Sequence, residues 1–321
     1  MQLTEQQLDF YVQNVLSFGP VDKRSYQDQI DNLITSLTRA VNDNSNLRVT
    51  KIQQAGSWRK GTALKPRDGQ ELDIDLVVYL DVSEATKTDV ATLHTLIIDL
   101  LCDVYPTKDR ADFPPSRKTV GIEFHTSGLW VDLAPVVPVA SPEGYVWQPE
   151  VGGGGAFLTS PAGQLAFVRA QKDTDPRYAS LVRLLKRARH HAELGGTLSS
   201  FALELVVAHV LGLRGPAPRL EEGLLRVLHY VAASGLRDPI AFPGAIRTCA
   251  PTAAPVRIYD PTNNENNVTS RIDEAGRRAI VAWATEALET LNYAQNVARK
   301  GDTLACWKDV FGPSFRIEDA P

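Results

Sequence analysis

Three aspartates stand in segments that are otherwise apolar. Asp73 and Asp75 lie two residues apart in "ELDIDLVVYLDV", and Asp132 lies in "LWVDLAPVVPV". Placing several carboxylates in one site costs free energy, because like charges repel each other, unless cations or protons neutralise them. Two carboxylates from one strand and one from the next suit two hard cations whose remaining ligands are water and phosphate oxygens. The three aspartates therefore predict a metal site for chemistry on phosphates.

The alternation of residues along a strand decides where these carboxylates point. Side chains alternate between the two faces of a strand, so Asp73 and Asp75 share one face, while Ile74 and Leu76 share the other. If the strand that carries Asp132 is a neighbour, its carboxylate joins the same face. The alternative is a strand whose acidic face is simply solvated, and a D-x-D pair alone does not exclude it because short motifs often match by chance.

A glycine-rich turn precedes the first pair of aspartates. In "GSWRKGT", Gly56 and Gly61 are separated by four residues, as in a Walker A loop, but Thr62 stands where the lysine is required. A strand is also expected next, where a P-loop would open a helix, so the P-loop interpretation fails. A turn that exposes backbone N–H groups and the Ser57 hydroxyl suits a triphosphate. The alternative is a surface hairpin with solvated cations. The cations near the turn are Arg59, Lys60 and Lys65.

The elements that must position these residues alternate between helix and strand in the first half of the chain. Apolar periodicity predicts helices over 25–41 and 88–104, and strands over 47–54, 71–82, 118–126 and 129–139. This mixture indicates an α/β (α+β) sheet domain. After the glycine run at 152–155 the pattern becomes helical, and 235–267 reads as long loops. The helices expected there are 161–172, 176–193, 199–213, 220–233, 274–299 and 303–311. We therefore expect a core over 1–155, with N-terminal helices, and a helical lobe over 156–321.

Bulk composition limits the function classes. The chain has 321 residues, 43% of them hydrophobic and 22% charged, which is ordinary for a soluble protein of about two domains. A formal net charge of −4 gives no indication of duplex DNA or of an anionic membrane as partner. The three cysteines show no C-x-x-C spacing, and neither a signal peptide nor a membrane span is evident. A cytoplasmic enzyme is expected.

The chain carries Gly56-Ser57, then Asp73-x-Asp75 and then Asp132. This series of motifs resembles that of the nucleotidyltransferases of the DNA polymerase β type. Within them, the chain looks like the bacterial CD-NTases, the cyclic-oligonucleotide synthases of anti-phage CBASS defence. These enzymes are related to cyclic GMP–AMP synthase and oligoadenylate synthase. The matching segments span nearly the whole chain: "GSWRKGTALKP" with "ELDIDLVVYLDV", "VDLAPVVP", "LVRLLKRARHH" with "LSSFALELVVAHVL", "YDPTNNENNV" and "CWKDVFGPSF". The resemblance implies a nucleotidyltransferase sheet lobe and a C-terminal helical lobe, with the active site in the cleft between them.

The resemblance also implies roles for the sheet residues. Asp73 and Asp75 would bind two metal ions, and Asp132 would bind the catalytic ion and help to deprotonate the acceptor hydroxyl. Gly56 and Ser57 would hold the donor triphosphate. The insert "PRDGQE" makes the spacing between the turn and the D-x-D pair somewhat long, which affects the rim of the site and not its metal ligands.

Two residues of the C-terminal half match positions that contact donor phosphates in the family. Lys186 lies in the basic run "RLLKRARHH", whose other cations are interpreted as a solvated helix face. Ser200 precedes an apolar helix, so the alternative for it is an N-terminal cap. A helix N-terminus can nevertheless attract phosphate. The segment from Asp260 to Asn267 matches a loop near the nucleotide cleft.

The implied activity is synthesis of a cyclic oligonucleotide second messenger from ATP and other NTPs, with release of pyrophosphate. The implied cofactors are two Mg²⁺ or Mn²⁺ ions, which would activate an acceptor ribose hydroxyl and neutralise the leaving pyrophosphate. The closest branch is encoded beside HORMA-domain and AAA+ ATPase proteins, which are the implied partners. This branch suggests an adenine-rich cyclic trinucleotide.

Two alternatives remain open at this level. The first is another enzyme of the same superfamily, either a tRNA CCA-adding enzyme or an antibiotic-modifying nucleotidyltransferase. A CCA-adding enzyme should carry a basic RNA-binding surface, which a net charge of −4 does not indicate. The second is a non-catalytic nucleotide-binding scaffold, against which the three intact aspartates argue.

Overall fold

The chain forms two compact units in a computed structural model, which describes residues 3–66, 71–81, 92–153 and 155–317. The sheet unit comprises Gly19–Gly61 and Pro66–Leu165. The helical unit comprises Met1–Phe18, Thr62–Lys65 and Ala166–Pro321. Most of the "PRDGQE" insert lies outside the described residues. The last boundary between the compact units falls after Leu165. The division predicted after residue 155 is one between functional lobes, which are defined differently from compact units, and it stays a prediction.

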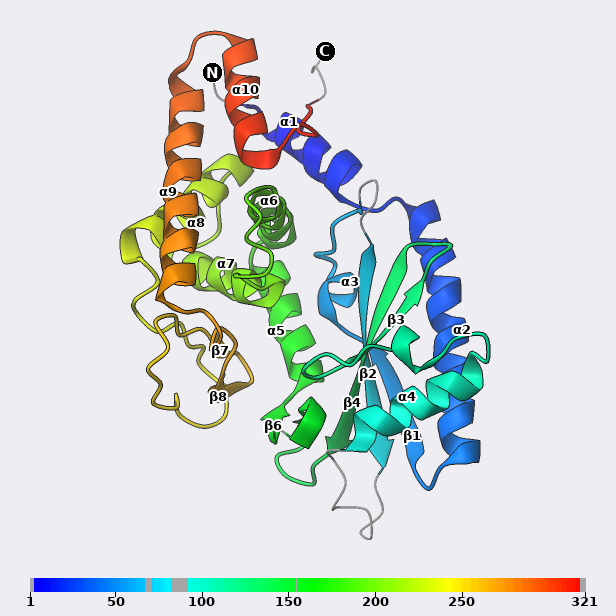
Figure 1. Cartoon of the computed structure of the whole chain (residues 1–321). Helices are drawn as coiled ribbons and strands as arrows, with labels where there is room; N and C mark the ends of the chain where they lie inside the picture. Colours follow the sequence, from blue (N-terminus) through cyan, green and yellow to red (C-terminus); the bar gives the residue numbers. More distant parts are fainter. Residues whose placement is uncertain (1–2, 67–70, 82–91, 154, 318–321) are drawn as a thin grey trace. The chain divides into compact units, whose positions relative to one another are not determined.

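The sheet unit is built on one mixed six-stranded sheet (Figure 1). Its strand order is β1-β2-β4-β5-β6, and β3 pairs with β4. The β2–β4 pair is parallel, whereas the other pairs are antiparallel. The strands are β1 (Arg48–Gln54), β2 (Leu72–Asp81), β3 (Val120–Phe124), β4 (Leu129–Pro138), β5 (Val146–Pro149) and β6 (Ala156–Thr159). The four longer strands were predicted, and the two four-residue strands were not.

Helices α2 (Pro20–Asn44) and α4 (Leu93–Val104) belong to the same unit. Helix α2 packs against β1 and α4, and α4 packs against β3 and β4 (Figure 1). The apolar stripe that predicted α2 is buried, as Ile30, Leu33 and Leu37 show. Burial of this stripe, and not helix propensity alone, stabilises the helix against the sheet. Residues 88–91 of the second predicted helix lie outside the described residues.

The helical unit contains the C-terminal helices and the N-terminal segment. Four aromatic rings, those of Tyr11, Trp307, Phe311 and Phe315, pack together in its core, with centroid separations of 4.6 to 6.0 Å. Tyr11 therefore joins residues 3–18 to this unit, although these residues were expected to belong with the sheet. The helices are α1 (Glu5–Phe10), a π-helix (Tyr11–Leu16), α5 (Pro161–Thr174, which begins in the sheet unit), α6 (Tyr178–His191), α7 (Ser200–Arg214), α8 (Leu220–Ser234), α9 (Glu274–Asn296) and α10 (Lys300–Phe311).

One part of the expected loop region is a hairpin. Strands β7 (Tyr259–Asp260) and β8 (Asn263–Asn267) pair within the segment that was interpreted as loops. Two side chains fix its backbone: the Asp260 carboxylate accepts from Thr262 N–H at 2.8 Å, and the Asn267 carbonyl oxygen accepts from Thr269 N–H at 2.9 Å. Asparagine and aspartate are depleted in ordinary strands, which is why the sequence pattern indicated loops.

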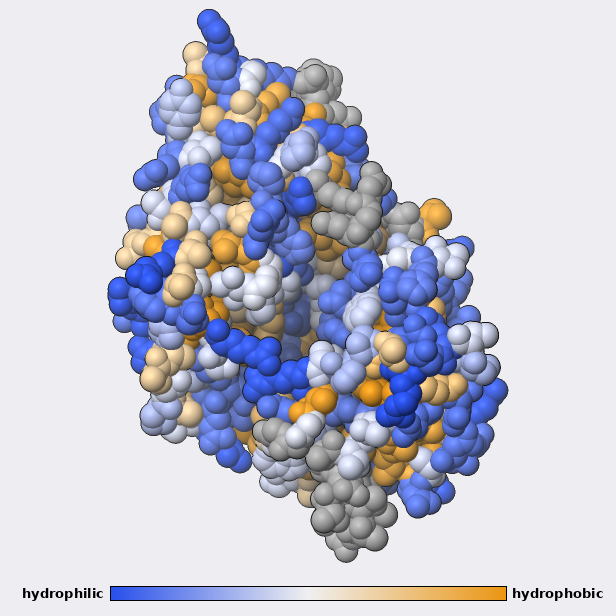
Figure 2. Space-filling model, in the orientation of Figure 1, coloured by the Kyte–Doolittle hydropathy of each residue, from blue (hydrophilic) through white to orange (hydrophobic). Residues whose placement is uncertain are grey.

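Hydrophilic residues predominate on the face shown in Figure 2, and hydrophobic residues occur there in small groups. Within the described part of the chain, none of the helices has the length and apolarity that crossing a membrane requires. The mixed sheet and the separate helical unit confirm the predicted fold class, while the position of an active site between the lobes stays a prediction.

Candidate active site

The register of β2 and β4 aligns the three aspartates. Asp75 pairs with Asp132 across the parallel strands, and Asp73 pairs with Trp130 two residues earlier. Paired residues of neighbouring strands point to the same face, and neighbouring strands lie about 4.8 Å apart. The three carboxylates therefore project from one small area of the sheet, as expected if the two strands are neighbours.

Burial distinguishes the two faces of β2. Leu72, Ile74 and Leu76 are buried, whereas Asp73 is exposed and Asp75 is half-buried. The apolar residues thus face the core, and this anchors the strand. The register is strongly specified, because a shift of one residue would turn the aspartates inward and the leucines outward.

Gly56 lies directly against the carboxylate of Asp75. A Cβ atom at Gly56 would stand 1.5 Å from Asp75 Oδ2 and 2.5 Å from Cγ, and the residue has a positive φ of +56°. A backbone hydrogen bond from Ala55 N–H to the Asp75 carbonyl, 2.8 Å long, holds the two segments together. Only glycine meets both conditions, so the glycine of the predicted phosphate turn also makes room for an aspartate of the predicted metal site.

The predicted turn is a short helix. Residues Gly56–Lys60 form α3, which ends at Gly61 in a left-handed conformation with φ +69°. The segment that was expected to be a turn is therefore a short helix, but the next described element after Gly61 is the expected strand, β2, and the lysine of a P-loop is missing, so a P-loop is still excluded. Of the nearby cations, Lys60 is buried, whereas Arg59 is exposed and lines a groove of about 440 Å³ beside the first turns of α2. Ser57 is partly buried at the first turn of the helix.

Asp132 is held by two side chains that the sequence did not single out. Its Oδ1 atom accepts hydrogen bonds from Thr119 Oγ1 at 3.1 Å and from Trp130 Nε1 at 3.2 Å. Trp130 precedes Asp132 by two residues on β4, so both lie on the same face. The i, i+2 spacing of a tryptophan and an aspartate in one strand was the only sequence signal for this contact.

The donor set suits divalent cations. Three carboxylates on one face of two paired strands are the hard oxygen ligands that Mg²⁺ and Mn²⁺ prefer. Among the residues that the structure describes, no three acidic, histidine or cysteine side chains converge closely enough to share one ion. Asp75 lies instead against Gly56, and Asp132 is bonded to Trp130 and Thr119. Residue types and strand register thus fit a metal site, and the carboxylates of Asp73 and Asp75 would have to turn toward an ion bound at Asp132.

The basic run of α6 was expected to be solvated, but the structure buries its cations. Lys186, Arg187 and Arg189 are 4%, 9% and 3% exposed. Lys186 Nζ donates to the Thr62 carbonyl at 3.1 Å, Arg187 Nε to the Phe311 carbonyl at 2.9 Å, and Arg189 Nη1 to the Leu198 carbonyl at 2.6 Å. Burial lowers the pKa of Arg189 to about 10, while the nearby Glu204 carboxylate acts in the opposite direction. These cations therefore join segments of the helical unit.

Ser200 is the first residue of α7 and is not its cap. Ser199 is the N-cap, since its side chain accepts from Ala202 N–H. Ser200 Oγ instead accepts from Arg189 Nη2 at 3.2 Å. The structure thus places Lys186 and Ser200 in one unit and on adjacent helices, and a phosphate-binding role for either residue stays a prediction.

Residues 62–65 form a strap that docks into the helical unit directly after the glycine turn. Thr62 is fully buried, and its hydroxyl donates to Glu204 Oε1 at 2.7 Å. Arg183 Nε donates to the Ala63 carbonyl at 3.3 Å, and Lys65 N–H donates to the Leu16 carbonyl at 2.8 Å. The chain therefore leaves the sheet unit at Gly61 and enters a buried polar network at the next residue.

This network predicts a large stability effect at Glu204. Glu204→Ala leaves the Thr62 hydroxyl and the Arg189 guanidinium without a buried carboxylate, so we expect a loss of about 3 kcal/mol in the free energy of unfolding. Chemical denaturation followed by circular dichroism measures it. Glu222→Ala is the matched control, because this exposed residue forms an i,i+4 ion pair with Arg226 that contributes about 0.5 kcal/mol. Equal losses for the two variants would contradict the interpretation.

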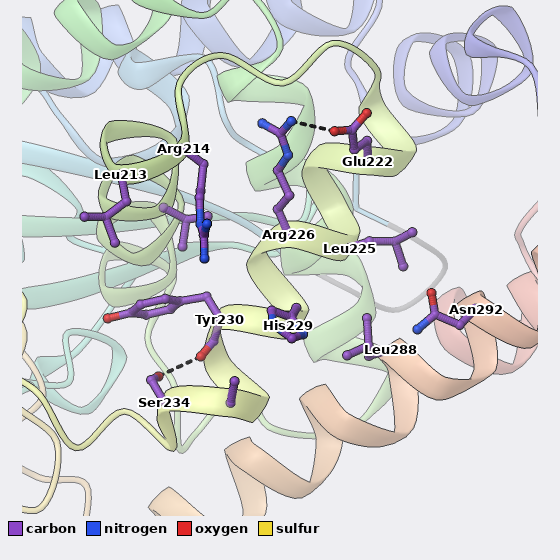
Figure 3. A pocket seen from close by; sticks show the side chains of 12 residues that line it. Leu213, Arg214, Glu222, Leu225, Arg226, His229, Tyr230, Ser234, Leu288 and Asn292 are labelled. Carbon is purple, nitrogen blue, oxygen red and sulfur yellow. Dashed lines mark hydrogen bonds and ion pairs between the residues drawn. The ribbon is translucent and has the colours of Figure 1, made fainter.

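A larger groove lies among three helices of the helical unit. Its volume is about 750 Å³, and its lining comes from the end of α7, the length of α8 and the second half of α9 (Figure 3). Its lining includes Leu225, Leu288, Arg214 and the ion pair of Arg226 with Glu222. None of the predicted site residues lines this groove, so it gives no support to a nucleotide site there.

Several known proteins are similar to this chain in sequence. Residues 2–151 match the family model described as "SMODS: Second Messenger Oligonucleotide or Dinucleotide Synthetase domain". The chain is 38% identical to "CBASS oligonucleotide cyclase CdnC" of Escherichia coli strain KTE188 over 321 residues, which cover all of both chains. It is 28% identical over 318 residues to "Cyclic AMP-AMP-AMP synthase" of E. coli strain MS 115-1, with 95% of this chain and 96% of the relative covered.

Solved structures agree with these similarities. The E. coli MS115-1 CdnC:HORMA-deltaN complex contains a chain that matches with a TM-score of 0.82 and 26% identity over 98% of both chains. The same enzyme solved with ATP also matches with a TM-score of 0.82, at 25% identity, over 98% of this chain and 99% of that one. The Vibrio cholerae DncV cyclic AMP-GMP synthase shares the fold at 15% identity, with a TM-score of 0.67 over 98% of this chain and 82% of that chain.

Proposed function

Because the chain belongs to the CBASS oligonucleotide cyclases, we propose that it joins ATP units into an adenine-rich cyclic trinucleotide. Its enzyme class is that of a nucleotidyltransferase that makes a cyclic oligonucleotide in anti-phage defence. Family membership sets aside the tRNA CCA-adding and antibiotic-modifying alternatives. The relative named cyclic AMP-AMP-AMP synthase supports adenine as the base and three as the number of units.

The observation that carries the proposed site is the alignment of Asp75 with Asp132 across β2 and β4. Asp73, Asp75 and Asp132 would hold two Mg²⁺ or Mn²⁺ ions. When bound, such ions lower the pKa of an acceptor hydroxyl and neutralise charge on the leaving pyrophosphate. The strands supply rigid attachment points for the three carboxylates, and the buried residues between them fix the register.

The donor triphosphate would lie at α3. Gly56 and Ser57 offer backbone N–H groups and a hydroxyl beside Asp75, to which the turn is tied by the bond from Ala55 N–H. Lys186 and Ser200 are the other two residues for which we propose contacts with donor phosphates, as the sequence resemblance implies. In this structure the ammonium of Lys186 also binds the Thr62 carbonyl, so a contribution of Lys186 to activity includes support of the strap that follows the turn.

We further propose a regulatory partner with a HORMA domain. The support is the similarity to the CdnC chain that was solved in a complex with HORMA-deltaN. An AAA+ ATPase would be a second partner, as the sequence resemblance implies. The enzyme would work in the cytoplasm, where its nucleotide substrates are made.

Product analysis tests this function. The protein is incubated with all four NTPs and Mg²⁺ or Mn²⁺, with and without a HORMA-domain protein, and the products are identified by mass spectrometry. We expect a cyclic trinucleotide that contains mainly adenine, together with pyrophosphate, and a higher yield with the partner. Absence of any product under both conditions would contradict the assignment, and a cyclic dinucleotide would contradict the proposed ring size.

A further inference from the structure

A second set of residues surrounds Asp132 on the face that carries the aspartates. In the row that contains Asp75 and Asp132, the third strand contributes Gly121, which pairs with Asp132. In the next row, Asp73 and Trp130 are followed by Glu123 on β3. The indole of Trp130 thus has an empty neighbouring position, that of Gly121, into which it can extend.

The indole fills that position closely. A Cβ atom at Gly121 would lie 2.3 Å from Cζ2 of Trp130, so the ring covers the glycine directly. In this orientation Nε1 reaches Oδ1 of Asp132 at 3.2 Å. A side chain at residue 121 would displace the ring, and Gly121 is therefore part of the arrangement that brings the indole N–H to the carboxylate.

Thr119 approaches the same oxygen from the turn before β3. Its hydroxyl donates to Asp132 Oδ1 at 3.1 Å and lies 2.6 Å from the Ser116 hydroxyl. Because the Thr119 proton is directed to Asp132, Ser116 is the donor in the second contact. A backbone hydrogen bond from Ser116 N–H to the Thr119 carbonyl, 2.8 Å long, closes this turn.

Both donors bind one oxygen of Asp132. Within the part of the chain that the structure describes, Oδ2 accepts no hydrogen bond, while Oδ1 accepts two. We propose that Trp130 and Thr119 are positioning residues that fix the rotamer of Asp132 by occupying Oδ1, so that Oδ2 is the oxygen presented to a divalent cation. This inference rests on the proposed function, because it assumes that Asp132 is a metal ligand.

The alternative is that Trp130 only shields the sheet and Thr119 only closes its turn. Variants with matched shape distinguish the two roles. Trp130→Phe keeps a ring over Gly121 but loses the N–H, and Thr119→Val keeps the branched shape but loses the hydroxyl. Thr119→Ser keeps the hydroxyl and serves as the conservative variant.

Mn²⁺ binding, measured by electron paramagnetic resonance with a non-hydrolysable ATP analogue present, provides a readout that does not depend on turnover. We expect Trp130→Phe and Thr119→Val each to weaken Mn²⁺ binding about tenfold, since each removes a hydrogen bond to a charged group. Thr119→Ser should stay within about twofold of the unmodified protein, because its hydroxyl can still donate. In steady-state assays, kcat should fall with Mn²⁺ affinity while KM for ATP changes little.

Asp132→Asn separates failure of this inference from failure of the proposed function. If Asp132→Asn retains synthesis, the metal-ligand role of Asp132 is wrong. If Asp132→Asn abolishes synthesis while Trp130→Phe and Thr119→Val bind Mn²⁺ like the unmodified protein, only the positioning role is wrong. An equal loss in Thr119→Ser and Thr119→Val would also overturn it, because the hydroxyl would then not be the group that matters.

Discussion

Asp75→Asn is expected to abolish cyclic oligonucleotide synthesis while the protein stays folded. The amide has nearly the same shape as the carboxylate but carries no charge, so the site loses an anionic ligand without a change in volume. We expect kcat to fall on the order of 1,000-fold or more, because charge stabilisation is a large component of phosphoryl-transfer catalysis. Asp73→Asn should have the same effect, because both residues project from one face of β2 beside Asp132.

The thermal stability of Asp75→Asn should be unchanged or higher, although its activity is lost. The three aspartates share one area of the sheet, so replacing one carboxylate relieves repulsion between like charges when no cation is bound. We expect the melting temperature of Asp75→Asn, measured without divalent ions, to equal or exceed that of the unmodified protein. Asp81→Asn is the matched control, because Asp81 is an exposed aspartate at the end of the same strand. Synthesis at the unmodified rate by Asp75→Asn would refute the proposed site.

The parts of the fold that sequence patterns predicted are long and regular. Helix α8 was expected over 220–233 and spans Leu220–Ser234, and helix α2 exceeds its predicted range by a few residues at each end. Such helices bury an apolar stripe whose period appears in the sequence. Strands β5 and β6 have four residues each, which is too short for a periodic signal. Residues 3–18 joined the helical unit through long-range packing that no local pattern contains.

The same limit applies to the candidate site. The apolar alternation around Asp73, Asp75 and Asp132 predicted one shared face, and the strand register agrees with it. The environment of Lys186 could not be predicted, because its acceptor, the Thr62 carbonyl, lies 124 residues away along the chain. A charged side chain in a sequence is expected to be exposed to solvent unless the groups that bind it are known. Groups that lie far along the chain can be identified only in the folded structure.

Gly56→Ala is expected to inactivate the enzyme through Asp75. The added Cβ would stand 1.5 Å from Asp75 Oδ2, a separation that real atoms do not adopt, so the carboxylate must move. A displacement of about 1 Å in a catalytic group can reduce turnover about 100-fold, and we expect at least that loss in kcat. The backbone adds a smaller penalty, because a positive φ costs a residue with a side chain about 1 kcal/mol.

Gly128→Ala separates these two effects. Gly128 also belongs to the sheet unit and has a φ of +63°, but a Cβ at this position meets no atom within 4 Å. Both variants should therefore lose about 1 kcal/mol of stability from backbone strain, since alanine is disfavoured in the left-handed region. Only Gly56→Ala should lose synthesis, as measured by pyrophosphate release under saturating ATP. If Gly128→Ala loses as much activity, backbone strain and not displacement of Asp75 explains the result, and the close contact between the turn and the aspartate has no catalytic importance.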